Sequence, residues 1–181
     1  MKHPLVAQLQ FTRQKFIDGF QNVSAEDAQR CIDPMNSLSW IIGHLAVHEL
    51  RVWVEIAQGR LFGENVLVCE GGKAKTNPNF DHMLRSWHLI TSTADDYLDH
   101  LTQDDMQTHF MWQGKQERED IGTMLQRNIY HYWYHIGEAQ SIRQMLGHPD
   151  LIQYVGAIPH SAIYHPEAAK SSALDEANET T

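Results

Sequence analysis

Histidine is the residue type that stands out in this sequence, with 12 copies among 181 residues. His131 and His135 are four residues apart in a segment with helical periodicity, so both imidazoles lie on one helix face, about one turn apart. His44 and His48 repeat this spacing in an earlier segment. One such pair is weak evidence, because histidines reach this spacing by chance. Two pairs on two core helices favour a metal, since a buried imidazole cluster without one leaves several polar rings desolvated.

Imidazole ligands indicate which chemistry such a site would support. Three neutral imidazoles suit zinc, nickel, copper or ferrous iron and leave open positions for water or a substrate anion. An open position distinguishes a catalytic metal site from a structural one. The sequence has no G-x-S-x-G elbow, no Walker A loop, no G-x-G-x-x-G and no H-E-x-x-H. A bound divalent metal is therefore the source of chemistry that the sequence predicts.

Four segments with helical periodicity have to position these histidines. The first covers residues 5–20, and the second begins after the N-cap candidate Ser37 and ends near Gln58. The third covers residues 80–101 and the fourth residues 120–146. Four long helical patterns without a convincing run of strands predict an all-α fold, a four-helix bundle.

The stretches between and after these helices are less regular. Residues 63–79, with paired glycines and an Asn-Pro, predict a long loop between the second and third helices, with a candidate extended piece over residues 66–68. The turn signal Gln113-Gly114-Lys115 indicates a small hairpin. We expect one domain over residues 1–166 and a disordered tail over residues 167–181, where the composition shifts to Ala, Ser, Glu and Asn.

Charge and cysteine content exclude several classes of function. The chain has 23 acidic and 14 basic residues, a net charge of -9 that opposes binding to a nucleic acid. Cys31 and Cys69 are far apart, so neither a disulfide framework nor a thiolate zinc site is indicated and a reducing compartment is expected. The N-terminus lacks the apolar region of a signal peptide, and no segment approaches the roughly 18 apolar residues of a membrane helix. We expect a cytoplasmic protein without a membrane partner.

Two segments of the sequence resemble a known family. SLSWIIGHLA (residues 37–46), followed by His48-Glu49, and HYWYHIGEAQ (residues 131–140) look like the two signature segments of the DinB-like, or YfiT-like, superfamily. The resemblance covers most of the chain in order and spacing. It implies a four-helix bundle in which one histidine of the second helix and an H-x-x-x-H pair of the last helix hold a divalent metal.

Transferred position by position, the resemblance implies that the metal ligands are His44, His131 and His135. His48 is not an expected ligand and is predicted to lie on the helix surface or beside the ligands. In many members the last segment reads H-R-G-Q, whereas this chain has H-I-G-E-A-Q. Glu138 thus replaces or shifts a common polar position, which leaves the details of substrate recognition open but not the ligands.

The resemblance also implies a class of reaction. Characterised relatives include S-transferases that use bacillithiol, mycothiol or glutathione, and a thiol-dependent maleylpyruvate isomerase. In such enzymes a zinc, nickel or iron ion would lower the pKa of a low-molecular-weight thiol, so that the thiolate attacks a small electrophile. A hydrolase-like catalyst that acts on a small electrophile is a related hypothesis. The alternative is a non-catalytic helical bundle stabilised by metal, or a stress-related binding protein. Homodimerisation is expected, because family members often pair through bundle faces.

Three further residues are candidates for a catalytic role. Glu49 and Glu138 fit a general base or an acceptor for imidazole N–H groups, although a solvated helix face or a capping pair is the more common use of such residues. Asn128 lies one turn before His131, where it would hydrogen-bond a bound water or substrate, or serve the structure alone.

The remaining conspicuous side chains favour structural roles. Arg143 fits a salt bridge within the bundle better than a contact with a substrate carboxylate. His148, His160 and His165 lie among turn residues and are predicted to be on the surface. The aromatic residues at helical spacing are predicted to pack in the core or in a dimer interface; they are Trp40, Trp87, Tyr130, Trp133 and Tyr134.

Overall fold

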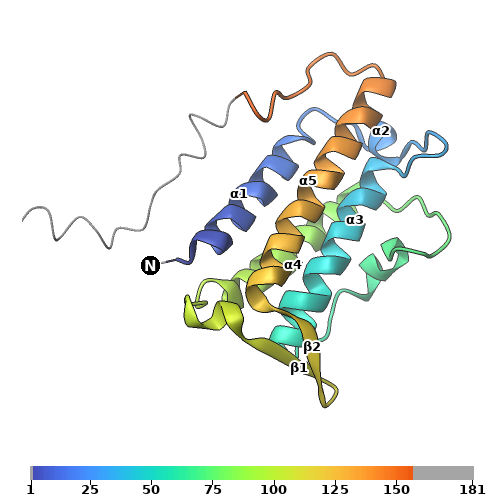
Figure 1. The fold of residues 1–181 in the computed structure, drawn as a ribbon. Helices are drawn as coiled ribbons and strands as arrows, with labels where there is room; N and C mark the ends of the chain where they lie inside the picture. Colours follow the sequence, from blue (N-terminus) through green and yellow to red (C-terminus); the bar gives the residue numbers. More distant parts are fainter. Residues whose placement is uncertain (1, 157–181) are drawn as a thin grey trace, which may run out of the picture. The chain divides into compact units, whose positions relative to one another are not determined.

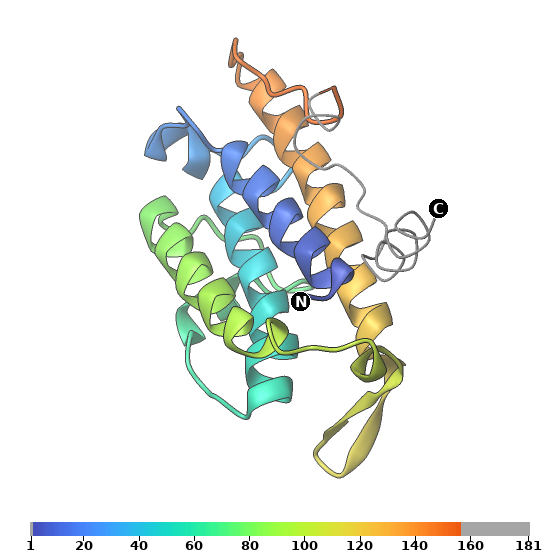
Figure 2. The same ribbon diagram turned by 90° about the vertical axis from the view of Figure 1, so that its left-hand side faces the viewer.

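The computed structural model describes residues 2–156 of the chain. Its four long helices are α1 (Pro4–Asp18), α3 (Leu38–Glu49), α4 (Phe80–Leu98) and α5 (Ile121–Met145). Helix α3 packs on α4 and α5, and α1 packs on α5 (Figures 1 and 2). All of these helices belong to the compact unit that ends at Leu151. The prediction of a mostly helical fold is confirmed.

Side-chain caps explain where the helices begin. The Ser37 hydroxyl accepts a hydrogen bond from the backbone N–H of Trp40 at the start of α3, and Asn79 and Asp120 cap α4 and α5 in the same way. Ser24 caps a further helix, α2 (Ala25–Gln29), between the first and second of the predicted helices. Five residues are too few for helical periodicity to be visible in the sequence, so this helix was missed.

The helical backbone continues without a break after α3 ends at Glu49. Residues Leu50–Ile56 form the π-helix η1, and the helical stretch ends at Gln58, where the sequence predicts the end of the second helix. Four residues of η1 are buried, and they include the fully buried Trp53. The continued helix therefore extends the apolar core beyond the histidines, towards the end of the molecule where the hairpin lies.

The connection between α3 and α4 contains a short helix rather than an extended piece. Residues Glu64–Cys69 form the 3-10 helix η2, so the extended piece expected over residues 66–68 is wrong. Val66 and Cys69 are both buried, and their spacing of three matches the repeat of a 3-10 helix that packs against α3. The β-branched residues of this segment favour an extended conformation, but packing on α3 favours the 3-10 helix.

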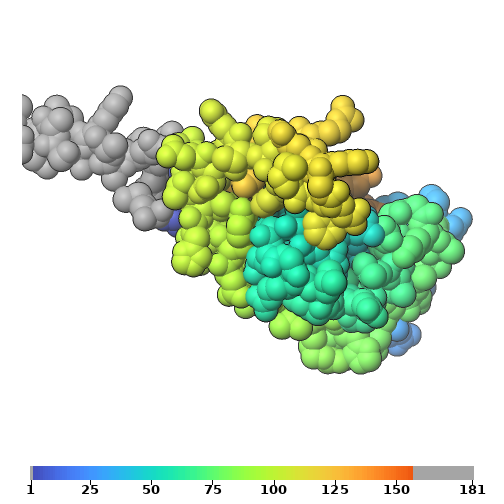
Figure 3. All heavy atoms as spheres, turned by 90° about the horizontal axis from the view of Figure 1, so that it is seen from below, coloured from blue at the N-terminus to red at the C-terminus, as the bar shows by residue number. Residues whose placement is uncertain are grey.

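A small hairpin precedes α5, as the turn signal predicted. Strands β1 (His109–Trp112) and β2 (Lys115–Asp120) pair antiparallel around Gln113 and Gly114, which both have positive φ. The short helix η3 (Asp104–Gln107) leads into the hairpin, and β1 contacts η1 at the lower end of the molecule (Figure 3). The fold is therefore helical with one two-stranded sheet, not strictly all-α.

The core is formed by the inward faces of the four long helices. Large side chains without exposure include Phe16, Trp53, Tyr132 and Leu125. Among the described residues, no helix combines the length and the apolar character that crossing a membrane requires.

Candidate metal centre

Three histidines converge between α3 and α5. The Nε2 atom of His131 lies 3.2 Å from Nε2 of His44 and 3.0 Å from Nε2 of His135. Each residue offers one nitrogen to the group, and these atoms lie within 4.8 Å of one another. Within residues 2–156, no further histidine, cysteine or carboxylate joins this group. The structure thus brings together the three residues that the family resemblance implied as metal ligands.

Two of these imidazoles are oriented by fixed acceptors. The Nδ1 atom of His44 donates to the backbone carbonyl oxygen of Cys69 at 3.0 Å. The Nδ1 atom of His135 donates to Oε2 of Glu138 at 2.7 Å. Because a carbonyl or carboxylate oxygen only accepts, each Nδ1 carries a ring proton, and the neutral form of such a ring directs the lone pair of Nε2 into the cluster.

This arrangement fits a cation better than hydrogen bonds between the rings. The Nε2 atoms of His44 and His135 are both acceptors, so only the Nε2 atom of His131 could carry a proton between the rings. One such proton cannot make good hydrogen bonds to both neighbouring nitrogens. Tetrahedral zinc with Zn–N distances of about 2.0–2.1 Å would separate its ligand nitrogens by about 3.3 Å. The two Nε2–Nε2 distances of 3.2 and 3.0 Å are close to that value. The three residues therefore fit a divalent ion in their spacing and in their donor atoms.

The electrostatics of the cluster keep its imidazoles available as ligands. Desolvation by burial, followed by the neighbouring histidines, lowers the pKa of His131 to about 3. Burial also lowers the pKa of His44. The hydrogen bond from His135 lowers the pKa of Glu138, so this group is a carboxylate at neutral pH. His44 and His131 are thus neutral near pH 7, which is the form that binds a metal.

Aromatic rings and a loop surround the cluster. Trp40 stacks on the imidazole of His44 with ring centroids 4.7 Å apart, and the edge of Tyr134 meets His135 at 5.0 Å. A Cβ atom at Gly71 would lie 3.4 Å from Cε1 of His44, so the loop after η2 covers this ring. Burial raises the pKa of the nearby Cys69 thiol to about 12, which leaves it protonated and a poor nucleophile.

The aromatic residues divide between core and surface. Trp40 and Trp87 are buried, as a core role predicts, and Trp133 is half-buried. Tyr130 and Tyr134 are 66% and 72% exposed, so they do not pack in the core of this chain. Both lie on the outward face of α5, where helical periodicity alone could not distinguish an inner from an outer position.

His48 stands beside the cluster but outside it. Its ring centroid lies 4.8 Å from that of His131, and its Nε2 accepts a hydrogen bond from Nη1 of Arg127 at 2.7 Å. Burial, together with the positive charge of Arg127, lowers the pKa of His48 to about 4. Arg127 was not among the predicted site residues, although its position four residues before His131 places it on the same face of α5.

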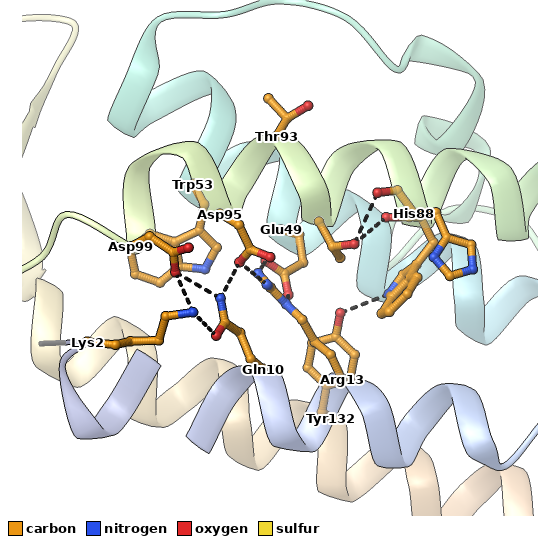
Figure 4. Close-up of polar contacts among 12 residues, drawn as sticks. Lys2, Gln10, Arg13, Glu49, Trp53, His88, Thr93, Asp95, Asp99 and Tyr132 are labelled. Carbon is orange, nitrogen blue, oxygen red and sulfur yellow. Dashed lines mark hydrogen bonds and ion pairs between the residues drawn. The ribbon is translucent and has the colours of Figure 1, made fainter. Parts of the chain in front are cut away.

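Glu49 belongs to a buried ion network and not to the metal centre. Its two carboxylate oxygens accept hydrogen bonds of 2.7 and 2.6 Å from Nε and Nη2 of Arg13, and Nη1 of Arg13 donates to Asp95 at 2.7 Å (Figure 4). Burial alone would lower the pKa of Arg13, but the charge of Glu49 raises it overall. The expectation of a solvated helix face was wrong for Glu49, because the sequence does not reveal that α1 supplies a buried cation.

Asn128 is the third catalytic candidate, and it is fully buried one turn before His131. Its amide lies beside His48. Neither its Nδ2 nor its Oδ1 atom makes a well-formed hydrogen bond with any residue in the described part of the chain. A buried amide without partners is unusual, and it distinguishes Asn128 from an ordinary structural asparagine.

The residues at the end of α5 have structural roles. Arg143 donates to the carbonyl oxygen of Gly19 at 2.7 Å and to Nδ1 of His148, which ties the end of α5 to the end of α1. His148 is therefore half-buried rather than on the surface, and its Nε2 lies 3.4 Å from Asp27. His160 and His165, like the tail predicted over residues 167–181, lie outside the described residues.

A hollow of about 340 Å³ lies elsewhere, on the connection between α3 and α4. It is shallow and is lined by residues of η2 and the loop that follows, among them Leu67, Lys73 and Thr76. No histidine of the cluster lines it. We place the chemistry at the histidines, because this hollow holds no group of catalytic or ligating chemistry in a convergent arrangement.

Comparison with known families gives one match. The model of a family described as the DinB superfamily matches residues 8–139, which make up more than half of the chain and include all three histidines of the cluster. No curated protein matches the chain.

Proposed function

The chain belongs to the DinB superfamily, and on this basis we propose that it is a divalent-metal-dependent enzyme with His44, His131 and His135 as ligands. The observation that supports this proposal is the convergence of their Nε2 atoms, two of which have their lone pairs directed inwards by acceptors on Nδ1. We also propose that α1, α3, α4 and α5 form the four-helix bundle expected of the family.

We propose that the reaction joins the sulfur of a small thiol to an electrophilic carbon of a small molecule. A new S–C bond forms, the leaving group departs with the electron pair of the broken bond, and the thiol proton goes to water. A zinc, nickel or iron ion would supply the Lewis acidity that lowers the pKa of the thiol. Support comes from the three-residue ligand group within residues 2–156, because three protein ligands leave a position for an exogenous group.

The protein's own residues prepare the ligands for this role. The carbonyl oxygen of Cys69 and the carboxylate of Glu138 hold two rings in one tautomer and one orientation. Trp40 stacks on His44 and restricts that ring to one plane. The thiol of Cys69 stays protonated and does not compete as a nucleophile.

Elemental analysis of the purified, untagged protein tests the metal centre. We expect about one equivalent of zinc, nickel or iron in the native chain and in His82→Ala, which removes an exposed histidine of α4. We expect loss of the metal in His44→Ala and in His135→Ala. The metal-loaded protein should then accelerate the reaction of glutathione with chlorodinitrobenzene, and the two ligand variants should not. Metal retained in both ligand variants, or absent from native protein that is folded, contradicts the proposal.

A non-catalytic role has one observation in its favour. One ligand comes from α3 and two come from α5, so a bound ion would cross-link two helices that are distant in sequence. In that role the metal would stabilise a helical bundle that binds a partner. The two functions differ in how much of the folding free energy depends on the ion.

A further inference from the structure

Buried polar atoms without a partner concentrate beside the histidine cluster. Within the described residues, five buried side-chain polar atoms lack a hydrogen-bond partner. Four of them belong to three neighbouring residues, as Nδ1 of His48, Nδ2 and Oδ1 of Asn128, and Nδ1 of His131. Leaving such an atom unsatisfied costs about 1–3 kcal/mol, and native proteins contain few of them. Their concentration distinguishes this place from the rest of the described core.

The hydrogen-bond chemistry of these atoms indicates which polar group fits. Because Nη1 of Arg127 only donates, Nε2 of His48 accepts from it and Nδ1 carries the proton of the neutral ring. A metal bound to Nε2 of His131 would likewise leave the ring proton of this residue on Nδ1. Of these four atoms, only Oδ1 of Asn128 is then an acceptor, and the amide of Asn128 already lies beside His48. The excess of donors fits a group that brings oxygen atoms.

Arg127 adds a positive charge at the same place. Its Nε donates to Oε2 of Glu119 at 2.8 Å and its Nη1 donates to His48, which leaves three of the five guanidinium N–H donors for another group. The side chain is 45% exposed, so a ligand can reach it from solvent. The contact with Glu119 shows that a carboxylate fits this guanidinium, and an exposed pair of this kind contributes little enough for a ligand to displace it.

We propose that Arg127, His48 and Asn128 form a carboxylate-binding subsite beside the metal centre, so that the small molecule bound there carries a carboxylate. The proposal rests on the proposed function, because it names the chemical class that the same site recognises. Arg127 would pair with the carboxylate, since its planar guanidinium matches the two oxygen atoms. Nδ1 of His48 and Nδ2 of Asn128 would supply neutral hydrogen-bond donors to the same carboxylate.

Two thiols that differ in charge test the subsite in the cobalt-loaded protein. Mercaptopropionate and mercaptopropanol each carry one thiol, but only mercaptopropionate carries a carboxylate. The binding of each compound can be followed through the absorption band that arises when its thiolate binds cobalt. We expect the native protein to bind mercaptopropionate at least about tenfold more tightly than mercaptopropanol. Arg127→Gln should abolish this preference and Arg127→Lys should keep part of it. Arg60→Gln, which breaks an exposed pair with Asp96, should leave it unchanged. Equal affinities in the native protein, or a preference that survives in Arg127→Gln, overturn the proposal.

A second titration separates this proposal from the metal centre. In metal-free protein, we expect propionate, but not propanol, to shift the imidazole NMR signals of His48, and we expect Arg127→Gln to remove the shift. If cobalt or thiol fails to bind while this response persists, the proposed function falls and the carboxylate subsite stands. If thiols bind to cobalt but propionate produces no shift that depends on Arg127, the subsite falls and the proposed function stands.

Discussion

The backbone carbonyl oxygen of Cys69 accepts a hydrogen bond from Nδ1 of His44 over a distance of 3.0 Å. This bond links the connection between α3 and α4 to a ligand of the candidate metal centre. It requires η2 to approach α3 closely, and Gly43 permits that approach. A Cβ atom at position 43 would overlap the Sγ atom of Cys69 and would lie 2.7 Å from Sδ of Met83.

Gly43→Ala should therefore destabilise the protein and weaken metal binding. In an open helix position, alanine would be more favourable than glycine by about 1 kcal/mol. Here we expect the overlap to cost about 1–3 kcal/mol more than this gain. Urea unfolding and competition with a chromogenic chelator measure the two effects. Adding Cys69→Ala, which removes the Sγ atom but keeps the carbonyl oxygen, should restore part of both. No rescue by the double variant would contradict this explanation.

Glu138→Gln should weaken metal binding without unfolding the protein. The neutral amide still accepts a hydrogen bond from His135 but no longer places a negative charge behind the ring, and loss of such a partner typically lowers metal affinity by about 10–100-fold. Competition with a chelator of known affinity measures the change. Glu26→Gln, on the exposed side of α2, is the matched control and should bind metal like the native chain.

Glu49→Gln should destabilise the fold while the metal stoichiometry stays unchanged. The variant removes the buried carboxylate partner of Arg13 and leaves only its pair with the more exposed Asp95, and breaking a buried pair on one side costs up to about 3–5 kcal/mol. The double variant Arg13→Met with Glu49→Leu should lose less stability, because it leaves no unpaired charge in the core. Loss of metal from folded Glu49→Gln would instead return Glu49 to the metal centre.

The stability of the metal-free protein should fall as the pH is lowered. Burial lowers the pKa of His48 to about 4 and that of His131 to about 3, below the ordinary value of about 6.5 that both regain on unfolding. Below pH of about 6.5 the unfolded chain takes up these protons and the folded chain does not, so the free energy of unfolding decreases until about pH 3.

Urea unfolding of the metal-free protein across this pH range measures the effect. His48→Gln removes one of the rings whose pKa is lowered in the folded protein, so its curve should be flatter than that of the native chain. The prediction fails if the native protein and this variant lose stability in parallel between about pH 6.5 and about pH 4.

Removal of the metal should distinguish the catalytic from the structural role. A catalytic ion held at a site that the protein itself preforms should be lost to a chelator with a drop in Tm of only a few degrees. A structural ion contributes much of the folding free energy, so its removal should unfold the chain or lower Tm by tens of degrees. Thermal unfolding with and without excess chelator gives the answer. His44→Ala without chelator should reproduce the Tm of the metal-free native protein.

Spacing along the chain was sufficient to predict the long helices and the pair His131 and His135, whereas the choice of His44 over His48 came from the family resemblance. Hydrophobic periodicity reflects which face of a helix is buried. The helix repeat places residues four apart on one face, independently of the tertiary structure. For this reason the pair His131 and His135, the helical end at Gln58 and the hairpin around Gly114 could all be predicted locally. Local chemistry also explains the caps at Ser37 and Asp120.

Only the tertiary structure decided what surrounds each of these residues. The role of Glu49 depends on Arg13, which is 36 positions away, and the role of His48 depends on Arg127, which is 79 positions away. The 3-10 helix η2 likewise depends on contact with α3. Hydrogen bonds and ion pairs require atoms within about 3 Å, and the chain path that brings such atoms together is a property of the packed core, not of any local pattern. The sequence by itself therefore determined which side chains could act as ligands, and the fold determined which partners orient them and hold their charge.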